Sequence, residues 1–178
     1  TYWVVLIASL SGQAIGDLLE LRVDTDGTVI NQASLAEILG QRLIDAGVGS
    51  DPENPTVWPV YINHKPDGAG APDSLIVVSD IDGVMDGRMP GGEAIVHSGA
   101  QVWVRAMEQK IGWKLIQDIT TLFLRQGIVD VVLDSRVYRI LNISQLGSVL
   151  PLGLEEGNRK RRYEFSANFL STTKEVGT

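Results

Sequence analysis

The chain has 178 residues and no cysteine, so disulfide bonds and thiolate metal sites are excluded. Hydrophobic residues make up 44% of the chain and charged residues 21%, proportions typical of a soluble globular protein with a core of useful size. The net charge is −7, and the two histidines, His64 and His97, are too few for a multi-histidine metal site.

The charges are distributed unevenly along the chain. Residues 1–100 hold 4 basic and 14 acidic residues, whereas residues 101–178 hold 11 basic and 8 acidic residues. The net charges of the two parts are therefore −10 and +3. This asymmetry is consistent either with a surface of two electrical faces or with chance placement on a solvated surface.

The first 33 residues are interpreted as an N-terminal extension, and residues 34–178 as the main domain. An apolar run from Tyr2 to Ala8 is far shorter than the roughly 20 residues that span a bilayer, and it lacks the basic start of a signal peptide. We expect it to be a core strand or a packing arm. Residues 18–30 alternate through Leu19, Leu21 and Val23 and then turn at Asp26-Gly27, which predicts a hairpin.

A first helix is predicted over residues 34–46. Ser34 and Glu37 have the spacing of a capping box, and Gly47 suits the C-terminal stop. The apolar residues of this segment recur on one face: Leu35, Ile38, Leu39, Leu43 and Ala46. Short strands are expected at 57–62 and 75–79. The polar, glycine-rich segment 80–93 is interpreted as a long functional or interface loop.

Residues 94–106 alternate as a strand, with Val102 and Val104 on one side and Gln101, Trp103 and Arg105 on the other. They lead into the best helical pattern of the chain, residues 107–125. Its apolar face is expected to hold Ile111, Leu115, Ile116, Ile119, Leu122 and Phe123, with Lys110, Lys114, Gln117, Asp118, Thr121 and Arg125 opposite.

The remainder of the chain is predicted to be β. A hairpin turns at Asp134-Ser135, residues 147–158 form a loop, and residues 161–170 alternate as a final strand. In that strand Tyr163, Phe165, Ala167 and Phe169 face one way and Arg162, Glu164, Ser166 and Asn168 the other. Single helices between runs of strands predict an α+β fold, a mostly antiparallel sheet packed with two main helices.

The candidates for chemistry are weak. Asp80, Asp82 and Asp86 surround a glycine and are compatible with calcium, but their spacing does not match the twelve-residue calcium loop. A solvated loop is the alternative. His97 lies in a strand without a nucleophile motif, and phosphate-loop and dinucleotide fingerprints are absent from the sequence. We therefore expect neither an enzyme nor a cofactor.

Four consecutive basic residues, Arg159, Lys160, Arg161 and Arg162, interrupt this acidic chain. Lysine and arginine displace counterions from DNA, yet a nucleic-acid binder usually has a broad basic surface with interleaved aromatic residues. Three interpretations stay open at this point: a solvated or salt-bridged loop, a protein–protein interface, and direct contact with DNA.

The order of motifs resembles the minor capsid and tail terminator proteins of long-tailed bacteriophages. The matches cover about residues 34–173, in a strand, a middle strand, a loop and a last strand. They are Gln101, Val102, Val104 and Arg105; Tyr138 and Ile140; Leu152, Gly153, Glu155, Arg162 and Tyr163; and Phe165, Ser166, Asn168 and Phe169.

The resemblance implies a structural virion protein at the junction of tail and neck, assembled in the host cytoplasm. Such a protein forms a ring, commonly a homohexamer. The ring caps the tail tube, ends its polymerisation and joins the tail to the head connector, while DNA passes through without sequence-specific binding. The alternatives are a calcium- or nucleic-acid-binding module and another neck or tail-completion protein. The interface candidates are Asp86, Arg88, Arg105, Glu155, Glu156, Asn158, Arg159, Lys160, Arg161 and Arg162.

Overall fold

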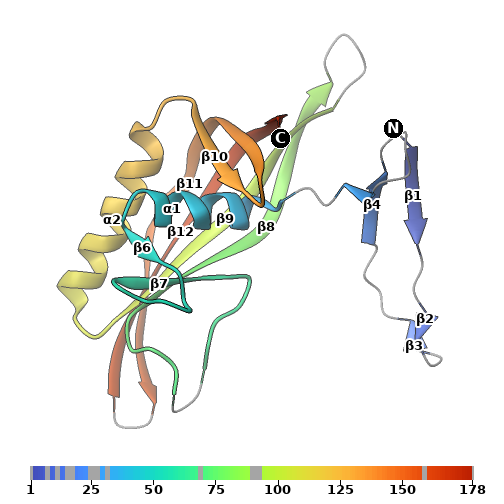
Figure 1. Ribbon diagram of the computed structural model, residues 1–178. Helices are drawn as coiled ribbons and strands as arrows, with labels where there is room; N and C mark the ends of the chain where they lie inside the picture. The colour runs from blue at the N-terminus through green and yellow to red at the C-terminus, as the bar shows by residue number, and fades with distance from the viewer. Residues whose placement is uncertain are drawn as a thin grey trace. The chain divides into compact units, whose positions relative to one another are not determined.

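The computed structural model of the chain describes residues 2–6, 9–10, 13–14, 19–23, 29–30, 33–67, 70–88, 94–157 and 160–177. The chain divides into two compact units, Thr1–Ala33 and Ser34–Thr178. Each unit is described by itself, and both are drawn in Figure 1.

The first unit is built from short strands. They are β1 (Tyr2–Leu6), β2 (Ser9–Leu10), β3 (Gln13–Ala14), β4 (Leu19–Val23) and β5 (Val29–Ile30). Strand β4 pairs antiparallel with both β1 and β5, and β2 pairs with β3. The β4–β5 pairing confirms the predicted hairpin, although its turn, Asp26-Gly27, lies outside the described residues.

The second unit contains a seven-stranded sheet and two helices. In chain order the elements are α1 (Leu35–Asp45), β6 (Gly49–Ser50), β7 (Trp58–Ile62), β8 (Leu75–Arg88), β9 (Ala94–Ala106), α2 (Gln109–Arg125), β10 (Val129–Leu133), β11 (Arg136–Gly157) and β12 (Lys160–Gly177). The strand order is β10-β11-β12-β9-β8-β7-β6. Only the β6–β7 and β7–β8 pairs are parallel among these described strands. The predicted α+β class with a mostly antiparallel sheet is confirmed.

Helix α1 begins with the predicted capping box. The Glu37 N–H donates to Ser34 Oγ at 3.2 Å, and the Ser34 N–H donates to Glu37 Oε2 at 2.7 Å. Gly47 follows the helix at φ 69°, a left-handed conformation that glycine adopts without strain. Helix α1 lies so close to β7 that a Cβ on Gly40 would be 2.3 Å from the Ile62 side chain.

Helix α2 lies against the sheet through a face slightly different from the predicted one. Its buried residues are Gly112, Leu115, Ile116, Ile119, Thr120 and Phe123. Ile111 is 47% exposed, so its expected place on the apolar face is wrong. Gly112 takes that place because a Cβ there would lie 2.6 Å from the Phe165 ring. A glycine at this position lets the helix backbone approach the sheet.

The main core lies between the helices and one face of the sheet. Register places Ile76, Val104 and Phe165 in one row across β8, β9 and β12. Phe123 of α2 meets Phe169 edge to face, with ring centroids 5.2 Å apart. The predicted facing of β9 and β12 is confirmed by the register, which places Val104 opposite Phe165 and Val102 opposite Ala167. The other face of these strands is buried as well, at Trp103, Arg105 and Ser166.

Two strands are longer than the sequence suggested. Strand β8 continues through residues 80–88, so the predicted loop there is wrong up to Arg88, and residues 89–93 lie outside the description. Strand β11 continues to Gly157 through the predicted loop 147–158. Both extensions contain register shifts, and Gly147 and Gly153 have positive φ angles of 73° and 113°. The glycines therefore mark bulges inside a paired strand instead of its end.

The β10–β11 hairpin turns at Asp134 and Ser135, as predicted. Both residues have positive φ, 49° and 66°, which suits a two-residue hairpin turn. Across the hairpin, Arg139 donates to both carboxylate oxygens of Asp130, at 2.7 and 2.8 Å. Hydrogen bonding from Arg139, and then its positive charge, hold the pKa of Asp130 below its ordinary value.

We predict that Arg139→Gln raises the pKa of Asp130 toward that of an ordinary aspartate, measured by a carboxyl NMR titration. The folded pKa is lowered, so this pair stabilises the fold above the unfolded pKa and loses its effect as pH falls through the folded pKa. Arg136→Gln is the matched control, because Arg136 pairs with Glu175. An unchanged Asp130 titration in Arg139→Gln would contradict the assignment.

Asp80 joins three elements at the start of α1. Its carboxylate accepts from the Ala36 N–H at 2.9 Å and from Asn63 Nδ2 at 2.8 Å. Its own N–H donates to Asn63 Oδ1 at 2.8 Å. A negative charge that accepts a hydrogen bond from the first helical turn is favoured there by the helix dipole. Asp80 therefore fixes α1 to β8 and to the residue that follows β7.

We expect Asp80→Ala to lower the free energy of unfolding by about 2 kcal/mol, since it removes a helix-capping acceptor and its bond to Asn63. Asp82→Ala, at an exposed neighbouring aspartate, should change it by less than about 0.5 kcal/mol. Urea denaturation of both variants measures the difference. Equal stability of the two variants would show that Asp80 does not hold these elements together.

Candidate assembly surface

The interface candidates predicted from the sequence lie at two opposite ends of the sheet. Asp86 and Arg88 belong to β8, in the two-stranded arm that it forms with β9. Glu155, Glu156 and residues 160–162 belong to the other end, where β11 and β12 meet (Figure 1). Asn158 and Arg159 lie outside the described residues. The structure therefore does not bring these candidates together in one site.

At the β11–β12 end, the basic run lies opposite acidic residues. The antiparallel register pairs Glu155 with Arg162 and Glu156 with Arg161. Cross-strand neighbours of opposite charge attract each other and favour this register. A run that looks purely basic in the sequence thus belongs to a paired segment with charges of both signs.

Arg162 and Arg161 differ in their surroundings. Arg162 donates from Nε and Nη2 to Asp73 Oδ1, at 3.1 and 2.8 Å, and only 11% of its side chain is exposed. Arg161 is exposed. Of these two arginines, only Arg161 has its charge on the surface.

The prediction that places Arg105 at a surface interface is wrong, because its side chain is entirely buried. Its Nη2 lies 3.2 Å from Asp67 Oδ1, its Nη1 donates to the Pro66 carbonyl at 3.4 Å, and its Nε lies 3.7 Å from Glu164 Oε1. Its guanidinium also lies 5.2 Å from the Trp103 ring centroid. Arg105 thus has a structural position on the sheet face opposite the helices.

The segment between β7 and β8 lies over that second face. Lys65 forms an ion pair with Glu164 at 3.1 Å and lies 4.1 Å from the Trp103 ring centroid. Beneath these charges is a small cluster of Leu75, Val77 and Trp103, against which Tyr61 packs. Four residues attach this segment to the sheet: Lys65, Pro66, Asp67 and Asp73. It therefore contacts the sheet although its sequence is rich in turn residues.

The proposed calcium ligands do not form a metal site among the described residues. No group of three or more potential His, Cys, Asp or Glu ligands occurs there. Asp80 already accepts hydrogen bonds through both carboxylate oxygens, and Asp86 is described at the backbone alone. His97 Nδ1 lies 2.7 Å from Thr172 Oγ1, a contact between neighbouring parts of the sheet.

The exposed apolar side chains gather on β11 and at the start of α2. On β11 the exposed fractions are 42% for both Leu141 and Leu146, 52% for both Leu150 and Leu152, and 39% for Leu154. Large exposed apolar patches on soluble proteins commonly mark interaction sites. These leucines do not share one face. Leu146 and Leu150 pair with Asn168 and Ser166 on the face opposite the helices, whereas Pro151 pairs with Phe165 on the helix side. Strand β11 thus offers apolar candidates for assembly on both faces.

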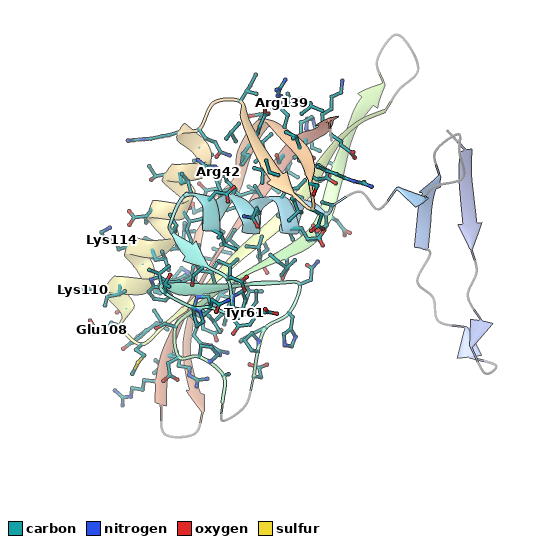
Figure 2. The ribbon with its side chains drawn as sticks, in the orientation of Figure 1. Arg42, Tyr61, Glu108, Lys110, Lys114 and Arg139 are labelled. Carbon is teal, nitrogen blue, oxygen red and sulfur yellow. The ribbon has the colours of Figure 1, made fainter. Side chains whose placement is uncertain are left out.

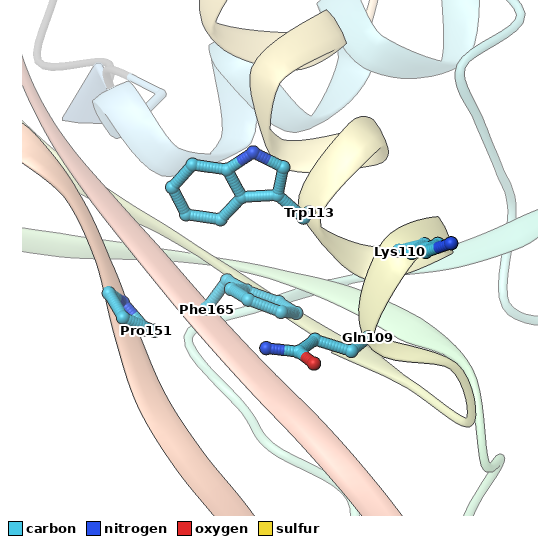
Figure 3. A pocket seen from close by; sticks show the side chains of 5 residues that line it. All are labelled: Gln109, Lys110, Trp113, Pro151 and Phe165. Atoms are coloured by element: carbon cyan, nitrogen blue, oxygen red, sulfur yellow. The ribbon is translucent and has the colours of Figure 1, made fainter.

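A pocket of about 350 Å³ connects this part of β11 with α2. Figure 3 shows Trp113 above the Phe165 ring, with Pro151 of β11 on one side and Gln109 on the other. The two ring centroids are 5.8 Å apart in an edge-to-face arrangement, and Trp113 is 42% exposed. A half-exposed tryptophan over an apolar floor is a typical anchor for a partner's side chain.

Positive charge lies beside the pocket. Lys110 lines its rim, and Lys110 and Lys114 also line a second hollow on α2 with Trp58 and Ile111. Figure 2 shows both lysines on the side of α2 that points away from the sheet. Lys114 forms an ion pair with Asp118 one turn further along the helix. The candidate surface is thus apolar at its centre, with Lys110 at its edge.

Sequence reasoning missed this surface because it assigned residues 147–158 to a loop. The letters "LPLGL", residues 150–154, do place leucine at every second position, which is a strand signal. Pro151, Gly147 and Gly153 are typical of loops, and they favoured the loop assignment over a strand. The pocket itself joins residues about 40 positions apart, so no local pattern indicates it.

We predict that Arg162→Ala lowers the free energy of unfolding by about 2 kcal/mol, because it removes the hydrogen bonds that Arg162 donates to the partly buried Asp73. Arg161→Ala, one residue earlier and exposed, should change it by less than about 0.5 kcal/mol. Chemical denaturation compares the two. A stable Arg162→Ala protein would return Arg162 to the surface candidates.

Neither described helix is long and apolar enough to cross a membrane. Searches of protein-family models and of curated proteins find no match to this chain.

Proposed function

We propose that this chain is a structural subunit that assembles with copies of itself into a ring at the end of a phage tail tube. In this role it ends polymerisation of the tube and joins it to the head connector, and DNA passes through the ring. The chain acts by binding other proteins and performs no reaction.

The apolar pocket at Trp113, on the helix side of the sheet, carries this proposal. The exposed leucines of β11 add further apolar surface. An apolar surface with an aromatic anchor suits a lasting contact between proteins better than transient contact with a small polar ligand. In a ring of identical subunits, such a surface meets a different surface of the next copy.

The order of the phage-like motifs also supports the proposal. Two of them, residues 101–105 and 165–169, lie far apart in the sequence but are adjacent strands in the fold, with Gln101 opposite Asn168. Gln101 Nε2 donates to Asn168 Oδ1 at 3.1 Å across the pair. The resemblance therefore includes residues that contact each other at the centre of the sheet.

The positions of the arginines favour protein binding over DNA binding. Arg105 and Arg162 are engaged by Asp67 and Asp73. The backbone register places Glu155 and Glu156 opposite the basic run. A DNA-binding surface would need several cations presented together.

We expect the purified protein to form rings of one size, observed by negative-stain electron microscopy and by light scattering. Added to polymerising tail-tube protein, it should cap the tube ends and limit their length. A protein that stays monomeric at all accessible concentrations and leaves tube length unchanged would overturn the proposal.

A charge reversal makes the test specific to the β11–β12 end. Arg161→Glu should weaken ring assembly or tube capping at least about tenfold, the equivalent of about 1.4 kcal/mol. The melting temperature should fall only slightly, from the like charge placed opposite Glu156. Lys174→Glu is the matched control, since it reverses an exposed cation at the far end of the same strand. Equal assembly of both variants would exclude Arg161 from the contact.

A further inference from the structure

Strand β11 has a long outer edge that its neighbour covers only in part. Strand β10 pairs with Arg136–Ile140 of β11. This pairing ends where Val129, the first residue of β10, lies opposite Ile140. From Leu141 to Gly157, the described strands provide β11 with a partner on one side alone, β12. An edge of this kind presents backbone N–H and C=O groups to any chain that can add a strand.

The outer edge of β11 lacks the charged residues that commonly prevent strand pairing. Proteins usually place charged residues along open edges to prevent pairing, but residues 141–154 carry no charge. Bulges and Pro151 interrupt the later part, whereas Asn142–Leu146 keeps a continuous register with β12. The regular, uncharged stretch is therefore the part best suited to accept a strand.

Apolar side chains flank the same stretch. Leu141 and Leu146 are each 42% exposed, and Ile128, which directly precedes β10, is 68% exposed. A strand added beyond the end of β10 would cover apolar side chains as well as backbone groups. Pairing by backbone, with selectivity from side chains, is the general mode of strand addition.

A second open edge lies toward the other end of the sheet. Strand β7 pairs with β8 only over Ile76–Val78, and the Asn63 N–H donates to the Val78 carbonyl just beyond β7. Further along, residues 81–88 have one described strand partner, β9, with register shifts after Ile81 and after Met85. This edge contains Asp82 and Asp86 in the sequence, and Val84 is 49% exposed.

We propose that the outer edge of β8, residues 81–88, adds as a strand to the outer edge of β11, at Asn142–Leu146, in a second copy of this chain. This inference rests on the proposed ring, because heterologous contacts between two different edges let every subunit bind two neighbours. Pairing of β8 with β8 brings aspartates together, whereas the β11 stretch has no charge to repel them.

Thiol crosslinking tests the pairing directly, because the chain has no cysteine of its own. Val84→Cys and Leu146→Cys place single thiols at exposed positions on the two edges. A bismaleimide reagent with a span of about 10 Å covers two adjacent strands, which lie about 4.8 Å apart, and tolerates a shift in register. Leu124→Cys, on an exposed position of α2, measures random collision.

We expect an equal mixture of Val84→Cys and Leu146→Cys to yield crosslinked dimers, with little product from either variant alone. At about 10 μM protein the mixture should react roughly 100-fold faster than Val84→Cys mixed with Leu124→Cys, because an interface holds thiols at millimolar effective concentration. The double variant Val84→Cys/Leu146→Cys should form longer ladders, since each copy then has both partners.

Two results would overturn the pairing. One is a Leu146→Cys homodimer that forms as fast as the mixed product, which would indicate β11 against β11. The other is a mixed product no faster than the Leu124 control while the unmodified protein forms rings. The latter outcome would leave the ring in place. Specific mixed crosslinks without rings or capped tubes would support the pairing and contradict the proposed function.

Discussion

Strands β9 and β12 pair antiparallel along the middle of the sheet, and side chains on both of their faces are buried. On the helix side, Val104 lies opposite Phe165 and Val102 opposite Ala167. On the other side, Trp103 and Ser166 are opposite each other and both are less than 10% exposed. A one-residue slip would exchange the two faces and place Arg105 under the helices. The register of this pair therefore determines where each helix and the covering segment can lie.

The second face imposes a further requirement because it buries a charge. A guanidinium removed from water is costly unless partners satisfy it. Glu164, at the same register position on β12, provides one charge, and the segment after β7 provides Asp67 and the Pro66 carbonyl. The segment thus depends on Arg105 for its anchor, and Arg105 depends on the segment for its burial. The contacts of Arg105 with Pro66 and Asp67 therefore hold this part of a glycine- and proline-rich stretch against the sheet.

The sequence was sufficient to predict those elements whose signals are local. The Ser34–Glu37 capping box, the Asp134-Ser135 turn and the alternation through Phe165 and Phe169 each depend on a few adjacent residues, and each was found. The extended parts of β8 and β11 were not, because glycines that form bulges resemble glycines that end strands. Gly112 was also missed, since only the position of Phe165 shows why a side chain would not fit there.

The candidate surface was harder to predict for a physical reason. Charged residues are conspicuous in a sequence, but here many of them join the two parts of the chain: Asp67 with Arg105, Lys65 with Glu164, and Asp73 with Arg162. Each pair links the acidic residues 1–100 to the basic residues 101–178 or the reverse, so part of the charge asymmetry is neutralised inside the second unit.

The uncharged β11 edge is inconspicuous in the sequence, because its leucines lie among glycine, serine and proline. If contact between subunits uses this edge, affinity comes from backbone hydrogen bonds and apolar burial. The exposed Arg161 at the β11–β12 end would then act on orientation and on the rate of encounter as well as on the strength of binding. Through this residue the basic run, first considered as a site for DNA, would guide the approach of another protein subunit.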